Sequence, residues 1–441
     1  MSAETNFMTN ELEVGLPPLQ ASRKAVWDYY RIEFLPSGYP GRRHDGELQA
    51  HPIYGPYVIS DYVAQYRKTK DPVFLEAACK VADAAIGQMT AVKAGLVFMY
   101  DQAKTNVSSK KGVFYSGLTQ SRYIEVLSKL MTLPGTERFS EPLHAVLASL
   151  TIPIKDGGVA RWTRNGGLVI EEYPGAMPDL TLNGWTTATC IVMDFAKRND
   201  DEQAREVFEK SVRGLEELVP LYDVPELANS RYRLTGPATF KLSAEDSDLE
   251  VFDCRIVIPG SGTYPANMEG DPAGKVLHGG PLAIRYGEAH TIAVSLSRLS
   301  WPDSNRLTMW IRSTQDGRLK LAIGEGAYDP LARAPRAKTY RDLQTVEVHK
   351  GWNIIDVEIP WRDAELIAYP TNFGKKITGR QFNQYHFIHI DTLGKIVAET
   401  GSEVLRQYHQ KWEQYPTQWA DIAEYQDERL MLDRFDAKKH K

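Results

Sequence analysis

The spacing of apolar residues changes twice along this chain, and these changes limit the folds that it can adopt. From Val58 to Ala85, apolar residues recur three or four positions apart, as on one face of amphipathic helices. Between Gly236 and about residue 375 they alternate with polar residues instead, which is typical of strands with one buried face. Helical spacing then returns. The pattern predicts an α+β chain in which an all-β sandwich is inserted into a helical domain.

The helical part of the sequence is arranged in pairs of segments. In the first pair, Lys70, Asp71 and Pro72 form a tight turn between two helices. Repeated hairpins of this kind predict a layer of the α/α toroid type. Short strand-like segments at 95–100 and 157–173 lie between the pairs, the second with Gly166 and Gly167 at its turn. The later pairs are predicted at 117–132 with 137–150, 180–197 with 201–218, and 392–413 with 417–434.

These patterns divide the chain into three parts. Residues 1–55 are punctuated by proline turns and predict an extended N-terminal arm. Residues 56–236 and 376–441 form the predicted α/α domain, and residues 237–375 the inserted β-sandwich. An arm of this kind can embrace a second subunit, so the sequence is compatible with a homodimer.

Charge and cysteine usage exclude several classes of protein. The net charge is −5, from 52 basic and 57 acidic residues, which argues against a nucleic-acid partner. No apolar run approaches the roughly 18 residues of a membrane helix, and no secretion signal opens the sequence, so we expect a cytoplasmic protein without a membrane span. Cys79, Cys190 and Cys254 are far apart in the sequence, which predicts buried, reduced thiols.

The sequence predicts neither a cofactor nor a metal. Signatures of nucleotide, dinucleotide and metalloprotease sites do not occur in it. His386 and His389 are three positions apart and could share a helical face, but Asp391 is the only ligand type close to them. We therefore expect His386 to position a substrate carboxylate instead.

Tyrosine is the unusual residue type, with 22 against 14 phenylalanines. Several tyrosines stand beside charged or turn residues, where a phenol can bind a sugar or transfer a proton. Tyr173 follows two glutamates and precedes a proline, Tyr232 lies between Arg231 and Arg233, and Tyr385 precedes His386.

The order of these segments resembles the C-terminal catalytic region of D-glucuronyl C5-epimerases. The matching pieces are EEYP at 171–174, LNGW at 182–185, VPLYD at 219–223, the tyrosine between basic residues at 232, and YHxxHI at 385–390. The stretch FYSGLTQ at 114–120 is similar to a further piece of the family pattern. The resemblance covers about 56–236 and 380–420.

The resemblance implies which residues act. Glu172, Tyr173, Tyr232 and Tyr385 correspond to acid and base groups of the family, with Asn183 as a supporting hydrogen-bond partner. Where the family has an arginine three residues after the second tyrosine, this chain has Thr235, so Arg231 or Arg233 would take over that task.

The implied activity is inversion of carbon 5 in D-glucuronyl residues of a polysaccharide, giving L-iduronyl residues. This reaction removes the proton beside the carboxylate and returns one to the opposite face, so it needs two proton carriers. Glutamate and tyrosine form a suitable pair. The substrate carboxylate needs cationic or hydrogen-bonding partners, for which the candidates are Arg161, Arg164, Asn183, Arg231, Arg233 and His386, with Tyr115 and Gln120 from the FYSGLTQ stretch.

Two other functions remain open from the sequence. A polysaccharide lyase begins with the same proton abstraction but then expels the group at carbon 4. A non-catalytic glycan-binding protein would use the β unit, whose tryptophans are Trp301, Trp310, Trp352 and Trp361.

Overall fold

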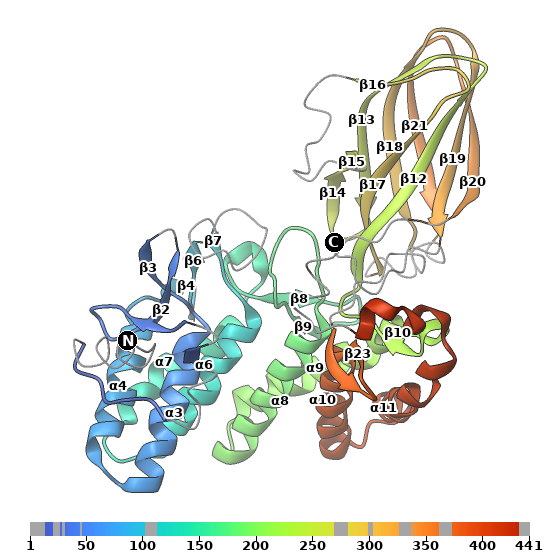
Figure 1. Ribbon diagram of the computed structural model, residues 1–441. Coiled ribbons are helices and arrows are strands. Elements are labelled where there is room, and N and C mark those ends of the chain that lie inside the picture. Colours follow the sequence, from blue (N-terminus) through green and yellow to red (C-terminus); the bar gives the residue numbers. More distant parts are fainter. Residues whose placement is uncertain are drawn as a thin grey trace. The chain divides into compact units, whose positions relative to one another are not determined.

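A computed structural model describes residues 14–20, 27–28, 31–44, 46–101, 113–268, 281–298, 303–325, 337, 339–360 and 373–431. The chain mixes helices and strands, and its packing divides it into two compact units (Figure 1). Unit 1 comprises 1–174 and 184–217, and unit 2 comprises 175–183 and 218–441. This division differs from the predicted one, because the last helices share a unit with the strands of 235–359. The toroid-like arrangement of the helix hairpins stays a prediction.

Unit 1 consists of helix hairpins linked by short two-stranded and three-stranded sheets. The predicted hairpins at 56–85, 117–150 and 180–218 are confirmed as pairs of consecutive helices. The helices are α3 (Tyr54–Thr69), α4 (Pro72–Ile86), α6 (Gly117–Leu130), α7 (Ser140–Ser149), α8 (Leu182–Asn199) and α9 (Glu202–Tyr222), of which the last two continue into unit 2. The strands are β1 (Glu33–Phe34), β2 (Pro40–His44), β3 (Glu47–Ala50), β4 (Thr90–Val92), β5 (Gly95–Val97), β6 (Tyr100–Asp101), β7 (Val113–Phe114), β8 (Ala160–Trp162) and β9 (Leu168–Ile170).

The predicted turn between the first two helices is confirmed in detail. Lys70 ends α3 in the left-handed conformation, with φ of 62°. The side chain of Asp71 then accepts a hydrogen bond from the backbone N–H of Val73, and Pro72 occupies the first helical position, where its missing N–H costs nothing.

The described part of residues 1–55 is packed against unit 1 instead of extending from it. The hydroxyl of Tyr62 on α3 donates to the carbonyl of Pro17 at 2.7 Å, and the ammonium of Lys80 on α4 donates to the carbonyl of Val14. Strands β1 to β3 form a small antiparallel sheet. The prediction of an extended arm is therefore wrong for these residues, because α3 and α4 bind their backbone carbonyls and the side chains of Leu16, Leu19 and Trp27 are buried.

Most of unit 2 consists of two five-stranded antiparallel sheets, which we call the two-sheet region (residues 235–359). Apolar side chains from both sheets form one shared core, in which Phe240, Ile256 and Leu307 are fully buried. One sheet has the order β15-β17-β12-β19-β20, and the other the order β14-β13-β18-β21 with β16 beside β13. The strands are β12 (Thr235–Glu245), β13 (Leu249–Ile258), β14 (Gly262–Pro265), β15 (Asn267–Met268), β16 (Leu282–Ile284), β17 (Ala289–Ser297), β18 (Asn305–Ser313), β19 (Gly317–Glu325), β20 (Thr339–Val348) and β21 (Gly351–Ile359).

The C-terminal part of unit 2 differs from the prediction. Instead of one helix over 392–413, the chain forms α10 (Gln384–Thr400) and α11 (Glu403–Gln414). Gly401 ends α10 with φ of 66°, and the side chain of Ser402 caps α11. The helix predicted at 417–434 is also wrong, because the described residues there form short 3₁₀ turns.

The carboxylate of Asp223 holds these C-terminal elements on the segment that follows α9. It accepts hydrogen bonds from the indole of Trp412 at 2.9 Å and from the hydroxyl of Tyr415 at 2.7 Å, and it pairs with the ammonium of Lys411. The Asp223 side chain is only 8% exposed, so each donor would lose its partner in a poorly solvated place if the carboxylate were removed.

Replacing this carboxylate should destabilise unit 2. We expect Asp223→Ala to lower the free energy of unfolding by about 2–4 kcal/mol, because a buried charged acceptor and its donors are separated. Urea unfolding followed by tryptophan fluorescence measures the change. Asp391→Asn is the control, since its pair with Lys395 is exposed and worth at most about 0.5 kcal/mol. Equal stability of the two variants would contradict the role of Asp223.

Candidate functional site

Within unit 1, the predicted glutamate lies in the loop that follows β9. The backbone N–H of Gly117, at the start of α6, donates to the carbonyl of Glu171 at 2.9 Å. A Cβ atom at Gly117 would lie 2.6 Å from that carbonyl oxygen, so this close approach requires glycine. The start of α6 and the EEYP segment are thereby brought together in unit 1.

Glu172 is a buried side chain whose carboxylate lies against the first turn of α8. A Cβ atom placed on Gly184 would come within 2.1 Å of the Glu172 Oε2 atom and 2.9 Å of its Cβ atom. The glycine of the LNGW segment therefore leaves room for this carboxylate at the positive end of the helix. Tyr173, the next residue, is half-buried.

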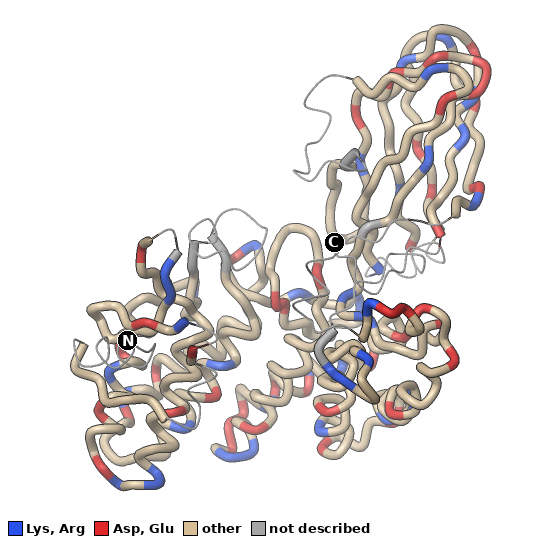
Figure 2. The backbone as a smooth tube through the Cα atoms, in the orientation of Figure 1, with Lys and Arg blue, Asp and Glu red and all other residues tan. Residues whose placement is uncertain are grey.

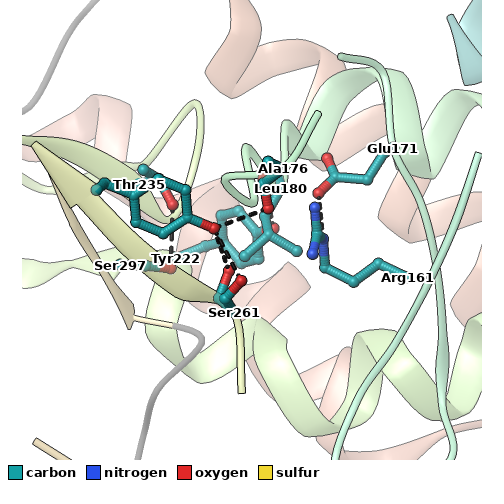
Figure 3. Close-up of polar contacts among 9 residues, drawn as sticks. Arg161, Glu171, Ala176, Leu180, Tyr222, Thr235, Ser261 and Ser297 are labelled. Carbon is teal, nitrogen blue, oxygen red and sulfur yellow. Dashed lines mark hydrogen bonds and ion pairs between the residues drawn. The ribbon is translucent and has the colours of Figure 1, made fainter. Parts of the chain in front are cut away.

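The arginines predicted to bind substrate in unit 1 have different surroundings. Arg161 on β8 pairs with the fully buried carboxylate of Glu171 at 2.8 Å (Figure 3). Arg164 lies in the exposed turn between β8 and β9. Arg161 thus supports the EEYP segment through Glu171, a contact that the sequence did not predict.

Tyr115 and Gln120 also differ from each other. Tyr115 is half-buried, which raises the pKa of its phenol. Gln120 is fully buried and donates to the Leu96 carbonyl at 2.6 Å and to the Ser149 hydroxyl at 3.2 Å, while its amide oxygen accepts from the Phe98 N–H. Both of its amide hydrogens are used inside unit 1, so the structure contradicts a substrate-binding role for Gln120.

Within unit 2, the two predicted tyrosines lie beside each other. The ring centroids of Tyr232 and Tyr385 are 4.7 Å apart, with the planes tilted by 42°. Tyr385 begins α10, where the side chain of Asn383 accepts from its backbone N–H at 3.0 Å. Tyr232 is fixed through its carbonyl, which accepts from the N–H of Leu182. Two phenols separated by 152 intervening positions are thereby brought together.

Asn183 follows Leu182, whose backbone N–H donates to the carbonyl of Tyr232. The hydroxyl of Tyr222 donates to the carbonyl of Leu180 at 2.7 Å (Figure 3). Leu180 has φ of 58°, a left-handed conformation that a leucine rarely adopts and that surrounding contacts must hold. Asn183 itself is buried at the start of α8.

The basic residues beside Tyr232 have different surroundings. Arg233 pairs with Asp179 at 3.1 Å and stays partly exposed, whereas the side chain of Arg231 is buried. At the position where the family pattern has arginine, the hydroxyl of Thr235 donates to Ser297 at 3.0 Å (Figure 3).

His386 does not have the role that the sequence suggested. It is fully buried, its Nδ1 atom lies 2.8 Å from the Ser230 hydroxyl, and its Nε2 atom lies 3.1 Å from the Trp412 carbonyl. Burial lowers its pKa to about 4, so the imidazole is neutral at pH 7. A neutral ring with both nitrogens bonded inside unit 2 cannot supply a cation for a substrate carboxylate.

His389 completes this buried cluster. Its Nδ1 atom lies 2.7 Å from the same Ser230 hydroxyl, and its pKa is held well below the ordinary value by burial and by the neighbouring His386. Both rings therefore contact the hydroxyl of one serine. Among the described residues, no three or more histidine, cysteine, aspartate and glutamate side chains form a group that could hold a metal ion.

The buried histidines should make unit 2 sensitive to acid. Their pKa values are lower in the folded state than the value of about 6.5 in the unfolded chain, so the unfolded chain binds more protons between pH 6.5 and 4. The free energy of unfolding should therefore fall as the pH falls through this window, by about 3 kcal/mol from His386 alone.

The contribution of His386 can be isolated with His386→Gln, whose amide keeps a donor for the Trp412 carbonyl. This variant should lose less stability than the native chain between pH 6.5 and 4, as measured by urea unfolding at each pH. His349→Gln, at a side chain 82% exposed, should keep the native pH dependence. If the free energy of unfolding fell equally with pH in His386→Gln and in the native chain, His386 would not be the source of the acid sensitivity.

Other predictions and features can be placed as well. The three cysteines are buried and unpaired by disulfides, as expected. Within the described residues, no helix is long and apolar enough to cross a membrane. Trp301 and Trp361 lie outside the described residues.

A cavity of about 610 Å³ in unit 1, beside Cys79, Lys80 and Arg138, shares no residue with the predicted site.

One part of the chain matches a known protein family. Residues 88–244 match the family described as the D-glucuronyl C5-epimerase C-terminus. In this region, the chain is similar to the D-glucuronyl C5-epimerase family. The epimerase-family region contains Glu172, Tyr173 and Tyr232, whereas Tyr385 lies outside it.

Individual relatives match over short stretches. A D-glucuronyl C5-epimerase of Caenorhabditis elegans is 28% identical over 122 residues, which is 25% of this chain and 20% of the relative. An uncharacterized protein of Methanocaldococcus jannaschii is 22% identical over 109 residues, 24% of this chain and 35% of that protein. This chain thus spans about a third or less of these relatives. The solved structure of an α-1,6-mannanase from Salegentibacter sp. matches with a TM-score of 0.32 and 12% sequence identity. The match covers 48% of this chain and 53% of the mannanase chain.

Proposed function

We propose that this protein is a polysaccharide C5-epimerase that converts D-glucuronyl to L-iduronyl residues. The family match of residues 88–244 supports an epimerase, and an isomerase of this kind needs no redox group. The observation that carries the proposal furthest is the pairing of Tyr232 with Tyr385. A phenol from the family region and a phenol from α10 lie beside each other although the chain between them forms a separate hydrophobic core.

In the proposed reaction, Glu172 and Tyr385 are the two proton carriers. One carrier takes the proton from carbon 5, and the electron pair of that C–H bond is delocalised into the adjacent carboxyl group. The other carrier then gives a proton to carbon 5 from the opposite face, which inverts the configuration. No C–O bond of the sugar chain breaks, so the polymer keeps its length.

The surroundings of Glu172 suit a group that must exchange protons. Its carboxylate is shielded from bulk water and is placed by Gly184 at the positive end of α8. Tyr173 is the next residue and is proposed as a hydrogen-bonding partner of the sugar. Arg233 and Asn183 are proposed to hold the substrate carboxylate, whose negative charge grows as carbon 5 loses its proton.

The native protein should exchange the carbon-5 hydrogen with solvent. In heavy water with heparosan, a polymer containing D-glucuronyl residues, we expect deuterium at carbon 5 and signals of L-iduronyl residues in the NMR spectrum, at constant polymer length. Shortening of the polymer with unsaturated, ultraviolet-absorbing ends would identify a lyase. Tight binding of several uronate polymers without exchange would identify a non-catalytic glycan-binding protein.

The phenol of Tyr385 should be needed for turnover but not for folding. Because Tyr385→Phe removes only a hydroxyl, we expect epimerisation to fall by about 10²–10⁴-fold, the usual contribution of a proton carrier, while the unfolding curve stays in place. Tyr66→Phe, at a half-buried tyrosine of α3, is the matched control. Full activity of Tyr385→Phe would remove this residue from the mechanism.

The position of Glu172 can be disturbed without touching the residue itself. In Gly184→Ala the new methyl group would overlap the Glu172 carboxylate, so the carboxylate must move. We expect turnover to fall on the order of 10²-fold, as for a displacement of about 1 Å, and the free energy of unfolding to fall by about 1–3 kcal/mol, because the methyl group overpacks a buried site.

Gly87→Ala is the matched glycine control. At this helix end the nearest contact of a new methyl group is 3.4 Å and φ is −61°, so alanine fits. If Gly184→Ala and Gly87→Ala were equally active, the placement of Glu172 would not matter for the reaction.

A further inference from the structure

The outer side of the sheet β14-β13-β18-β21 exposes large apolar side chains. Phe252 on β13, Trp310 on β18, and Trp352 and Ile354 on β21 are 37%, 54%, 63% and 70% exposed. We call these four residues the aromatic face. Large apolar side chains gathered on an exposed surface are typical of binding sites.

The strand register shows that these side chains form one surface. Trp310 lies opposite Ile354 on the neighbouring strand, and Trp352 lies opposite Arg312. The rings of Phe252 and Trp352 reach across β18, with centroids 4.6 Å apart. The opposite side of the same strands is filled by the shared core of the two-sheet region, so the aromatic face is not an unfinished part of that core.

A β-bulge places Phe252 on this surface. The pairing of β13 with β18 shifts between Val251 and Asp253. Val251 and Cys254 are both buried although they are three positions apart, so the bulge returns the strand to its core-facing alternation while Phe252 points outward.

Charged residues frame the aromatic face. Arg312 lies 3.5 Å from Glu250, Arg255 lies 2.6 Å from Asp253, and Arg306 pairs with Asp356. Figure 2 shows acidic and basic positions interspersed along these strands. Such exposed ion pairs contribute little to stability. The carboxylate of a ligand can therefore replace the acidic partner of an arginine at a small cost in free energy.

We propose that the aromatic face is a binding platform for an acidic glycan chain, separate from the residues that transfer protons. The C–H side of a pyranose ring can stack on the exposed indole rings, and its hydroxyl and carboxylate groups can reach the framing charges. Arg312, which lies opposite Trp352, is suited to a uronate carboxylate. The choice of an acidic glycan rests on the proposed function, whereas the platform itself rests on the exposed rings.

The platform should bind the polymer and raise the effectiveness of the enzyme on long chains. In the double variant Trp310→Ala with Trp352→Ala, we expect at least a tenfold loss of heparosan affinity in affinity electrophoresis. KM for long heparosan should rise by a similar factor at unchanged kcat, and kinetics on a short oligosaccharide should stay the same. Heparosan with its carboxyl groups reduced should bind the native protein several-fold more weakly, because Arg312 has lost its ionic partner.

Tyr286→Ala is the control, because Tyr286 is 66% exposed in the same two-sheet region but outside the aromatic face. Unchanged heparosan affinity of the double tryptophan variant would overturn the proposal. So would a native dimer in light scattering that the double variant turns into monomers without a change in glycan affinity, because the face would then be a contact between two copies. Binding that depends on the tryptophans in a protein without exchange at carbon 5 would support the platform and refute the epimerase.

Discussion

The buried carboxylate of Asp223 is the contact on which unit 2 depends. It binds the indole of Trp412, the hydroxyl of Tyr415 and the ammonium of Lys411, and so fixes α11 to the segment that follows α9. Through the Ser230–His386 hydrogen bond, the same segment fixes the start of α10. Tyr385 reaches Tyr232 as a consequence of this packing.

Local signals predicted much of the fold, and packing decided the rest. The Lys70–Pro72 turn and the alternation along β13 and β18 could be predicted from the sequence. Helix caps and burial on one face of a strand both produce characteristic patterns in neighbouring residues. The break at Gly401 carried a weaker signal, a glycine inside a helical pattern. The bulge at Phe252 needs a partner strand, so alternation alone could not predict that Val251 and Cys254 both face the core.

The candidate site shows the same division. The order of motifs identified Tyr232 and Tyr385 as partners, and the structure brings their rings together. Sequence reasoning assigned substrate contacts to Gln120 and His386, because polar side chains inside a family motif look alike whether they face a ligand or the core. Only burial and hydrogen-bond partners distinguish the two cases. Gly184 leaves room for Glu172 because it has no side chain. It stands in the matched LNGW segment, but the sequence analysis gave it no role.

In the proposed reaction, Glu172 and Tyr385 carry protons on opposite faces of one sugar ring. Exchange of carbon-5 hydrogen by variants with one carrier tests it most directly, with polymers of D-glucuronyl and of L-iduronyl residues in heavy water. The remaining carrier can still remove and return a proton on its own face. Glu172→Gln should therefore exchange only one of the two epimers, and Tyr385→Phe only the other, both without inversion. Folded variants that exchange the same epimer, or neither, would contradict the account.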